Sequence, residues 1–140
     1  MHSKGLGLGV VNEEMAFQWN LKAAKSGDSN GQVNLAFLYK EGKGVSQNDK
    51  ESVKWYLEAA KQENPHAQNN LASMYSKGRG VAQSYDEAIL WYQRAADNGF
   101  EPANANLIQA KAKKAAAEDN LPKPLVETKP SSEKARACLL

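Results

Sequence analysis

The chain has 140 residues, enough for one domain, and its 41% hydrophobic and 24% charged residues are an ordinary balance for a globular protein. Its net charge of +2, with Lys and Arg mixed among Asp and Glu, argues against a nucleic-acid partner or an anionic membrane surface. No apolar run approaches the ~20 residues of a membrane helix. Residues 1–11 lack the apolar region of a signal peptide, so we expect a cytoplasmic protein, with secretion by a non-classical route left open.

Candidate ligands for a metal or a covalent cofactor are few. Cys138 is the single cysteine, so no intramolecular disulfide is expected, and it stands third from the C-terminus where a prenylation box requires the fourth position. The two histidines, His2 and His66, have no second cysteine to complete a zinc site. We therefore expect no cofactor and no metal.

Three tryptophans mark an internal repeat. Trp19, Trp55 and Trp91 are 36 residues apart, and the Ala-Ala pairs at 23–24, 59–60 and 95–96 and the Asn-Leu pairs at 34–35, 70–71 and 106–107 keep the same spacing. A fixed period of this length is typical of stacked helical units rather than of one globular core.

The first unit is incomplete. The segment Gly7-Leu8-Gly9-Val10 reads as its loop, and only one helix, near residues 12–25, follows. Because no helix precedes it, we expect Phe17 and Leu21 to be exposed and this helix to fray. A homodimer through the incomplete unit is one way to cover them, although no residue pattern decides the oligomeric state.

Two complete units follow. The second of them, residues 66–102, begins with a helix whose apolar residues share one face. The segment Gly78-Arg79-Gly80-Val81 then breaks the helix, and Ser84 or Asp86 is the N-cap of the next one. The preceding unit has the same pattern, with its loop at residues 42–45.

The last unit supplies one helix from about Pro102, which becomes rich in Ala and Lys over residues 110–117 and is expected to be a polar end helix. From Asp119 onward, Pro and Ser replace any periodic apolar pattern, which predicts a flexible tail. The predicted organisation is therefore an N-terminal segment at 1–11, a repeat array at 12–118 and a polar tail at 119–140.

The repeated unit reads L-A-x-x-Y-x-x-G-x-G-V, a spacer, and W-Y-x-x-A-A, over residues 35–60 and again over 71–96. It resembles the Sel1-like repeat, a relative of the tetratricopeptide repeat. The resemblance implies an all-α fold, an α-α superhelix of antiparallel helix pairs, and a role as an adaptor or scaffold. One departure is that Asn20, rather than Tyr, follows Trp19.

Each conspicuous motif also has a structural interpretation. The Gly-Lys-Gly and Gly-Arg-Gly loops lack the preceding strand and the Gly-Lys-Ser/Thr ending of a phosphate-binding loop, so we interpret them as turns. Helical spacing favours core packing of Trp55, Trp91 and Tyr92 over an aromatic ligand platform. We expect Asn34, Asn70 and Asn106 to contact a neighbouring unit, with a contact to a bound peptide backbone as the alternative.

Residues that differ between units on the first helix of each pair are free to specify a partner. In the tetratricopeptide-like arrangement this helix lines the concave face. The resulting candidate partner-binding residues are Val33, Phe37, Lys40, Asn69, Ser73, Lys77, Gln109 and Lys113. Phe37 stands where the other units have Ser73 and Gln109, so it is either a binding anchor or a cover for the N-terminal helix.

The leading hypothesis is a non-enzymatic module that binds a peptide or a partner domain on this concave face. A secreted or host-interacting bacterial protein, or a fragment of a longer array, is the alternative. A β-lactam-binding enzyme is less favoured, because the cysteine-rich relatives with that association have disulfides and no nucleophile with a paired base is visible here.

Overall fold

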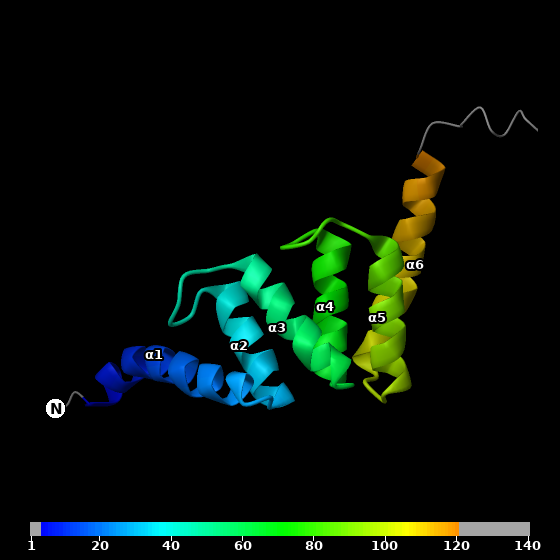
Figure 1. The fold of residues 1–140 in the computed structure, drawn as a ribbon. Coiled ribbons are helices and arrows are strands. Elements are labelled where there is room, and N and C mark those ends of the chain that lie inside the picture. Colours follow the sequence, from blue (N-terminus) through cyan, green and yellow to red (C-terminus); the bar gives the residue numbers. More distant parts are fainter. Residues whose placement is uncertain (1–3, 121–140) are drawn as a thin grey trace, which may run out of the picture.

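The computed structural model describes residues 4–120, with side chains from 13 to 119, and this part of the chain is all-α (Figure 1). Its six helices are α1 (Lys4–Lys25), α2 (Ser29–Glu41), α3 (Asp49–Lys61), α4 (Pro65–Lys77), α5 (Tyr85–Asp97) and α6 (Pro102–Asn120). Each helix packs mainly on the helix before it and the helix after it. The result is the expected α-solenoid of antiparallel helix pairs, in which neighbouring units supply each other's core.

Side-chain caps set where the helices begin, and the caps repeat with the sequence. Each cap oxygen accepts a hydrogen bond from the backbone N–H three residues later. The N-caps are Asp28 and Asn64 for first helices, and Asn48 and Ser84 for second helices. Of the two candidates for the cap of α5, Ser84 is therefore correct, and Asp86 lies in the first turn of that helix.

The Gly-x-Gly loops are turns that also pack against the neighbouring unit. Gly42 and Gly78 end α2 and α4 in the left-handed conformation, as expected. Gly44 and Gly80, both at φ +73°, lie against the backbone of the preceding second helix. A Cβ on Gly80 would stand 2.5 Å from the carbonyl oxygen of Asp49, so the contact requires glycine.

The core consists of the recurring residues of the repeat. Tyr56 and the alanine pair Ala59-Ala60 are fully buried, and Trp91 and Tyr92 are 8% and 7% exposed. The small alanines let helices approach closely while the aromatic side chains fill the remaining volume. The interpretation of Trp55, Trp91 and Tyr92 as core residues is confirmed, with Trp55 the most peripheral because it is only partly buried.

The N-terminal unit differs from expectation in two respects. Residues 7–10, expected to form a loop, belong to α1, which already begins at Lys4. Phe17 is also buried, at 8% exposure, with its ring edge-on to Tyr39 at 5.5 Å, and Leu21 is half-buried beside it. The expected exposure of these two residues was wrong because α2, with Val45 and Trp55 beside it, covers that side of α1. The exposed aromatic residue of α1 is Trp19, at 65%.

The C-terminal helix matches the predicted polar end helix and continues two residues beyond the predicted end of the array at 118. The division of the chain at residues 11 and 118 remains a prediction. The predicted tail lies outside the described residues, apart from Asp119 and Asn120, which end α6.

Candidate partner-binding surface

The eight predicted partner-binding residues all lie on first helices, in three groups. Val33, Phe37 and Lys40 are spaced along one side of α2, Asn69, Ser73 and Lys77 along α4, and Gln109 and Lys113 along α6. The three groups are not equally accessible. Phe37, Lys77, Gln109 and Lys113 are exposed, while Val33 is half-buried because it packs against the main core.

Phe37 is the most distinctive feature of this surface. It is 42% exposed, and two lysine amino groups, those of Lys40 and Lys43, each lie 5.7 Å from the centroid of its ring. The negative face of an aromatic ring attracts such cations. An apolar ring flanked by two positive charges is suited to a ligand that carries both an apolar group and a carboxylate.

The repeat shows what Phe37 replaces. In the next unit the same position is Ser73, whose hydroxyl lies close enough to the phenol of Tyr92 to lower its pKa. The residue equivalent to Tyr92 is Tyr56, whose hydroxyl is buried and finds no hydrogen-bond partner among the described residues. A buried hydroxyl without a partner costs about 1–3 kcal/mol. Phe37 therefore stands where the next unit has a hydroxyl beside the equivalent tyrosine.

The electrostatics of the two tyrosines follow this difference. Burial raises the pKa of the Tyr56 phenol strongly, Glu41 raises it further, and Arg79 partly opposes the shift. Burial also raises the pKa of Tyr92, but the Ser73 hydroxyl works in the opposite direction. Both phenols are thus neutral at physiological pH and act as structural groups.

Amide side chains link neighbouring units, as the recurrent asparagines predicted. Asn34 donates to Asn20 of α1 at 3.3 Å, and Asn106 donates to Asn69 of α4 at 2.9 Å. No such bond is present for Asn70 in the described part of the chain. Asn69 and Ser73 thus have structural roles that sequence comparison did not anticipate, and they contribute to the stack whether or not they contact a partner.

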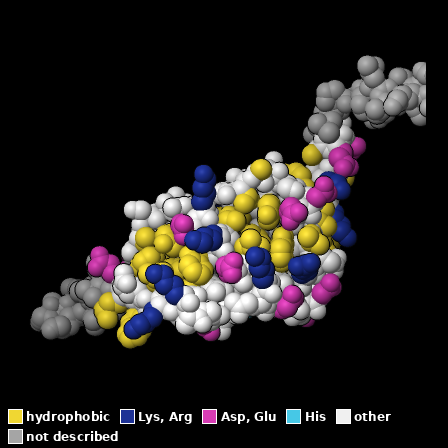
Figure 2. Space-filling view, viewed as in Figure 1, with side chains coloured by type: hydrophobic (Ala, Val, Ile, Leu, Met, Phe, Trp, Pro, Cys, Tyr) yellow, Lys and Arg dark blue, Asp and Glu magenta, His cyan; other side chains and the backbone are white. Residues whose placement is uncertain are grey.

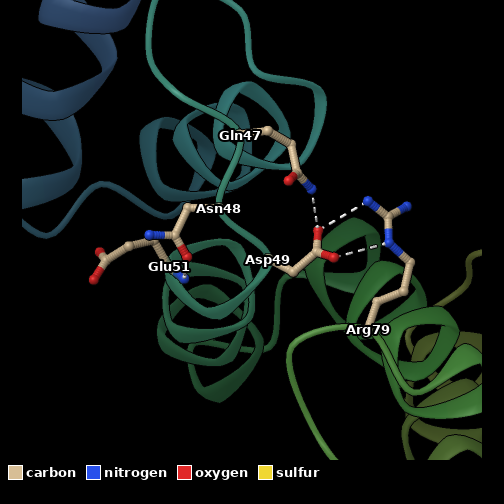
Figure 3. A network of polar contacts seen from close by, with 5 residues as sticks. All are labelled: Gln47, Asn48, Asp49, Glu51 and Arg79. Atoms are coloured by element: carbon tan, nitrogen blue, oxygen red, sulfur yellow. Dashed lines mark hydrogen bonds and ion pairs between the residues drawn. The ribbon is translucent and has the colours of Figure 1, made fainter.

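Lys43 is the residue that the sequence reasoning missed. Its equivalent in the next unit is Arg79, which forms two hydrogen bonds with the Asp49 carboxylate at 2.8 and 3.2 Å (Figure 3). Gln47 donates to the same carboxylate at 2.7 Å. Lys43 forms no ion pair within residues 13–119 and lies over Phe37 instead. The sequence contains a sign of this difference, because Lys43 stands where the next unit has Arg79. Both residues were interpreted only as parts of a turn.

The surface around these residues is mixed in character. On the face shown in Figure 2, hydrophobic side chains gather over α1 and α2 and again over α4 and α5, with Lys and Arg side chains among them. Between residues 13 and 119, no group of His, Cys, Asp or Glu side chains is placed to hold a metal ion. None of the described helices is long and apolar enough to cross a membrane.

The Sel1 repeat family model matches three consecutive segments, residues 1–28, 29–64 and 65–100. This chain belongs to the Sel1 repeat family. Members of this family generally mediate protein–protein interactions. A search of curated proteins gave no match.

Solved structures of Sel1 repeat proteins share the fold. A Sel1 repeat protein from Oxalobacter formigenes is 41% identical over 67% of this chain and 39% of its own, with a TM-score of 0.64. A protective antigen of uropathogenic Escherichia coli, with an SLR fold, is 38% identical over 67% of this chain and 22% of its own, with a TM-score of 0.61. The chain thus spans less than half the length of these two relatives.

Cysteine-rich protein B of Helicobacter pylori has the same fold. Its TM-score is 0.62, with 21% identity over 75% of this chain and 93% of its own. At this identity the likeness supports the architecture alone.

Proposed function

We propose that this protein is a non-enzymatic interaction module that binds an acidic, partly apolar peptide or partner segment along its first helices. Phe37 is the anchor, and Lys40 and Lys43 pair with carboxylates of the ligand. Lys77, Gln109 and Lys113, which are exposed on α4 and α6, extend the same surface. Sel1 repeats generally mediate protein–protein interactions, and that family role supports the proposal.

The observation that carries the proposal is the exposed Phe37 ring between two lysine amino groups. Serine at this position should give the buried Tyr56 hydroxyl a polar neighbour, as Ser73 does for Tyr92. An exposed aromatic residue that leaves a buried hydroxyl without a polar neighbour is better explained by a ligand than by folding.

A random-peptide selection on the intact protein tests this function. We expect the selected peptides to be enriched in Asp and Glu beside an apolar residue, and to bind less tightly as salt rises. The Phe37→Ser variant introduces the residue that the next unit has at the equivalent position, so it should fold normally. Its affinity for the selected peptides should fall about tenfold or more, as expected for loss of an interface anchor.

Leu90 on α5 supplies the matched control, because it is 43% exposed but lies on a second helix. Leu90→Ser should leave peptide affinity unchanged, while Lys40→Glu and Lys43→Glu should each reduce it. Selected peptides without acidic residues, or equal loss in the Phe37→Ser and Leu90→Ser variants, would show that the binding surface lies elsewhere.

A further inference from the structure

The outward face of α1 carries the largest exposed aromatic residue in the described part of the chain. Trp19 is 65% exposed and Met15 is 46% exposed. Two hollows, of about 390 and 500 Å³, adjoin Trp19, and Gln18 lines both. The amino group of Lys22 lies 6.0 Å from the Trp19 ring.

In the other units the equivalent tryptophan packs against the helix that precedes it. Trp55 of α3 packs against the cluster that contains Leu35 and Leu38 of α2, and Trp91 of α5 is buried in the cluster that contains Leu71 of α4. On α1, no described residue covers the corresponding side. The Trp19 face thus has the shape and chemistry of a surface on which a helix packs.

The charges on this face favour a second α1 running in the opposite direction. Glu14 precedes Gln18 by four residues and lines one hollow, whereas Lys22 follows Gln18 by four residues and lines the other, together with Lys25. When two copies pair antiparallel with their Gln18 residues opposite, Glu14 of each copy faces Lys22 of the other. Such a patch is complementary to itself, which is the requirement of a two-fold interface.

The C-terminal helix of a second copy fits this face less well. Ile108 on α6, 68% exposed, stands one period after Ala72, which is fully buried. Lys111 likewise replaces Tyr75. A branched side chain where the repeat has alanine keeps a following helix at a distance, so α6 has the character of a cap.

We propose that the α1 face formed by Glu14, Met15, Gln18, Trp19 and Lys22 binds the same face of a second copy, antiparallel about a two-fold axis. One helix face is a small interface, so a dissociation constant of about 10 µM to 1 mM is expected. This proposal is independent of the peptide-binding function, because it uses α1 rather than α2.

Sedimentation equilibrium of the full chain tests the proposal. The mass should rise with concentration from 15.3 kDa toward twice that value. Trp19→Ser should weaken association about tenfold or more, while Ile108→Ser, a matched exposed apolar residue on α6, should leave it unchanged. Circular dichroism melts confirm that both variants fold.

Charge reversal gives the sharper result. Glu14→Lys and Lys22→Glu should each weaken association, and the double variant should restore it, since it exchanges the two charges across the axis. The proposal is overturned by a monomer at all concentrations up to about 1 mM, by failure of the double variant to recover, or by assemblies larger than dimers that Ile108→Ser disrupts.

Discussion

Tyr56 and Tyr92 occupy equivalent positions in consecutive units, yet removal of their hydroxyls should have different effects on stability. The Tyr56 hydroxyl is buried without a partner, so Tyr56→Phe removes an unsatisfied group. Tyr92→Phe removes the polar interaction of the phenol with the Ser73 hydroxyl. A typical hydrogen bond of this kind contributes about 0.5–1.5 kcal/mol, whereas a buried unpaired group costs about 1–3 kcal/mol.

We therefore expect Tyr92→Phe to lower the free energy of unfolding by about 1 kcal/mol. Tyr56→Phe should leave it unchanged or raise it by up to ~1 kcal/mol, because part of the desolvation cost is recovered. Urea denaturation followed by circular dichroism measures both. In a thermal melt, a difference of 1 kcal/mol corresponds to about 4 °C for an array of this size.

The Phe37→Ser background completes a double-mutant cycle. Serine at 37 offers Tyr56 the partner that Ser73 gives Tyr92, so Tyr56→Phe should now cost about 1 kcal/mol. The coupling between positions 37 and 56 should consequently be about 1 kcal/mol or more. Equal effects of Tyr56→Phe in the two backgrounds, or equal losses for Tyr56→Phe and Tyr92→Phe, would refute the reasoning.

Three further predictions concern the junctions between units. Gly80→Ala should lower the free energy of unfolding by about 3 kcal/mol or more, and Gly99→Ala by about 1 kcal/mol. Both glycines have positive φ, but of these two only Gly80 lies against the backbone of another helix. Denaturant unfolding curves of the two variants compare these losses. Asp49→Asn should lose about 1 kcal/mol through the half-exposed Arg79 pair, and the loss should shrink at high salt. Hydrogen bonds from Asn98 and Gln68 lower the pKa of the Glu63 carboxyl. The contribution of Glu63 to the free energy of unfolding is therefore present above the ordinary carboxyl pKa and is lost as the pH falls through the lowered pKa. In thermal melts at a series of pH values, Glu63→Gln should lose less stability in acid than the unchanged protein.

The sequence alone determined the repeating architecture, because its signals are local. The 36-residue period, the caps at residues such as Ser84 and the glycines at 42 and 78 act within a few residues of where they stand. The same comparison between units singled out Phe37, since a residue that departs from the repeat is visible without coordinates. Local rules failed over residues 7–10, where a glycine-rich segment that resembles a loop continues α1.

Only the tertiary structure decided which of the repeated residues are buried and what they contact. Phe17 is covered by α2 while Trp19, in a position that is covered in the other units, is exposed, since burial depends on which neighbouring helix is present. Lys43 lies over Phe37 whereas its equivalent Arg79 binds Asp49, and the loop sequence does not predict either contact. Periodicity determines which side of a helix faces its neighbours. The packing partner determines whether a given side chain is buried, forms a contact between units or stays exposed to solvent.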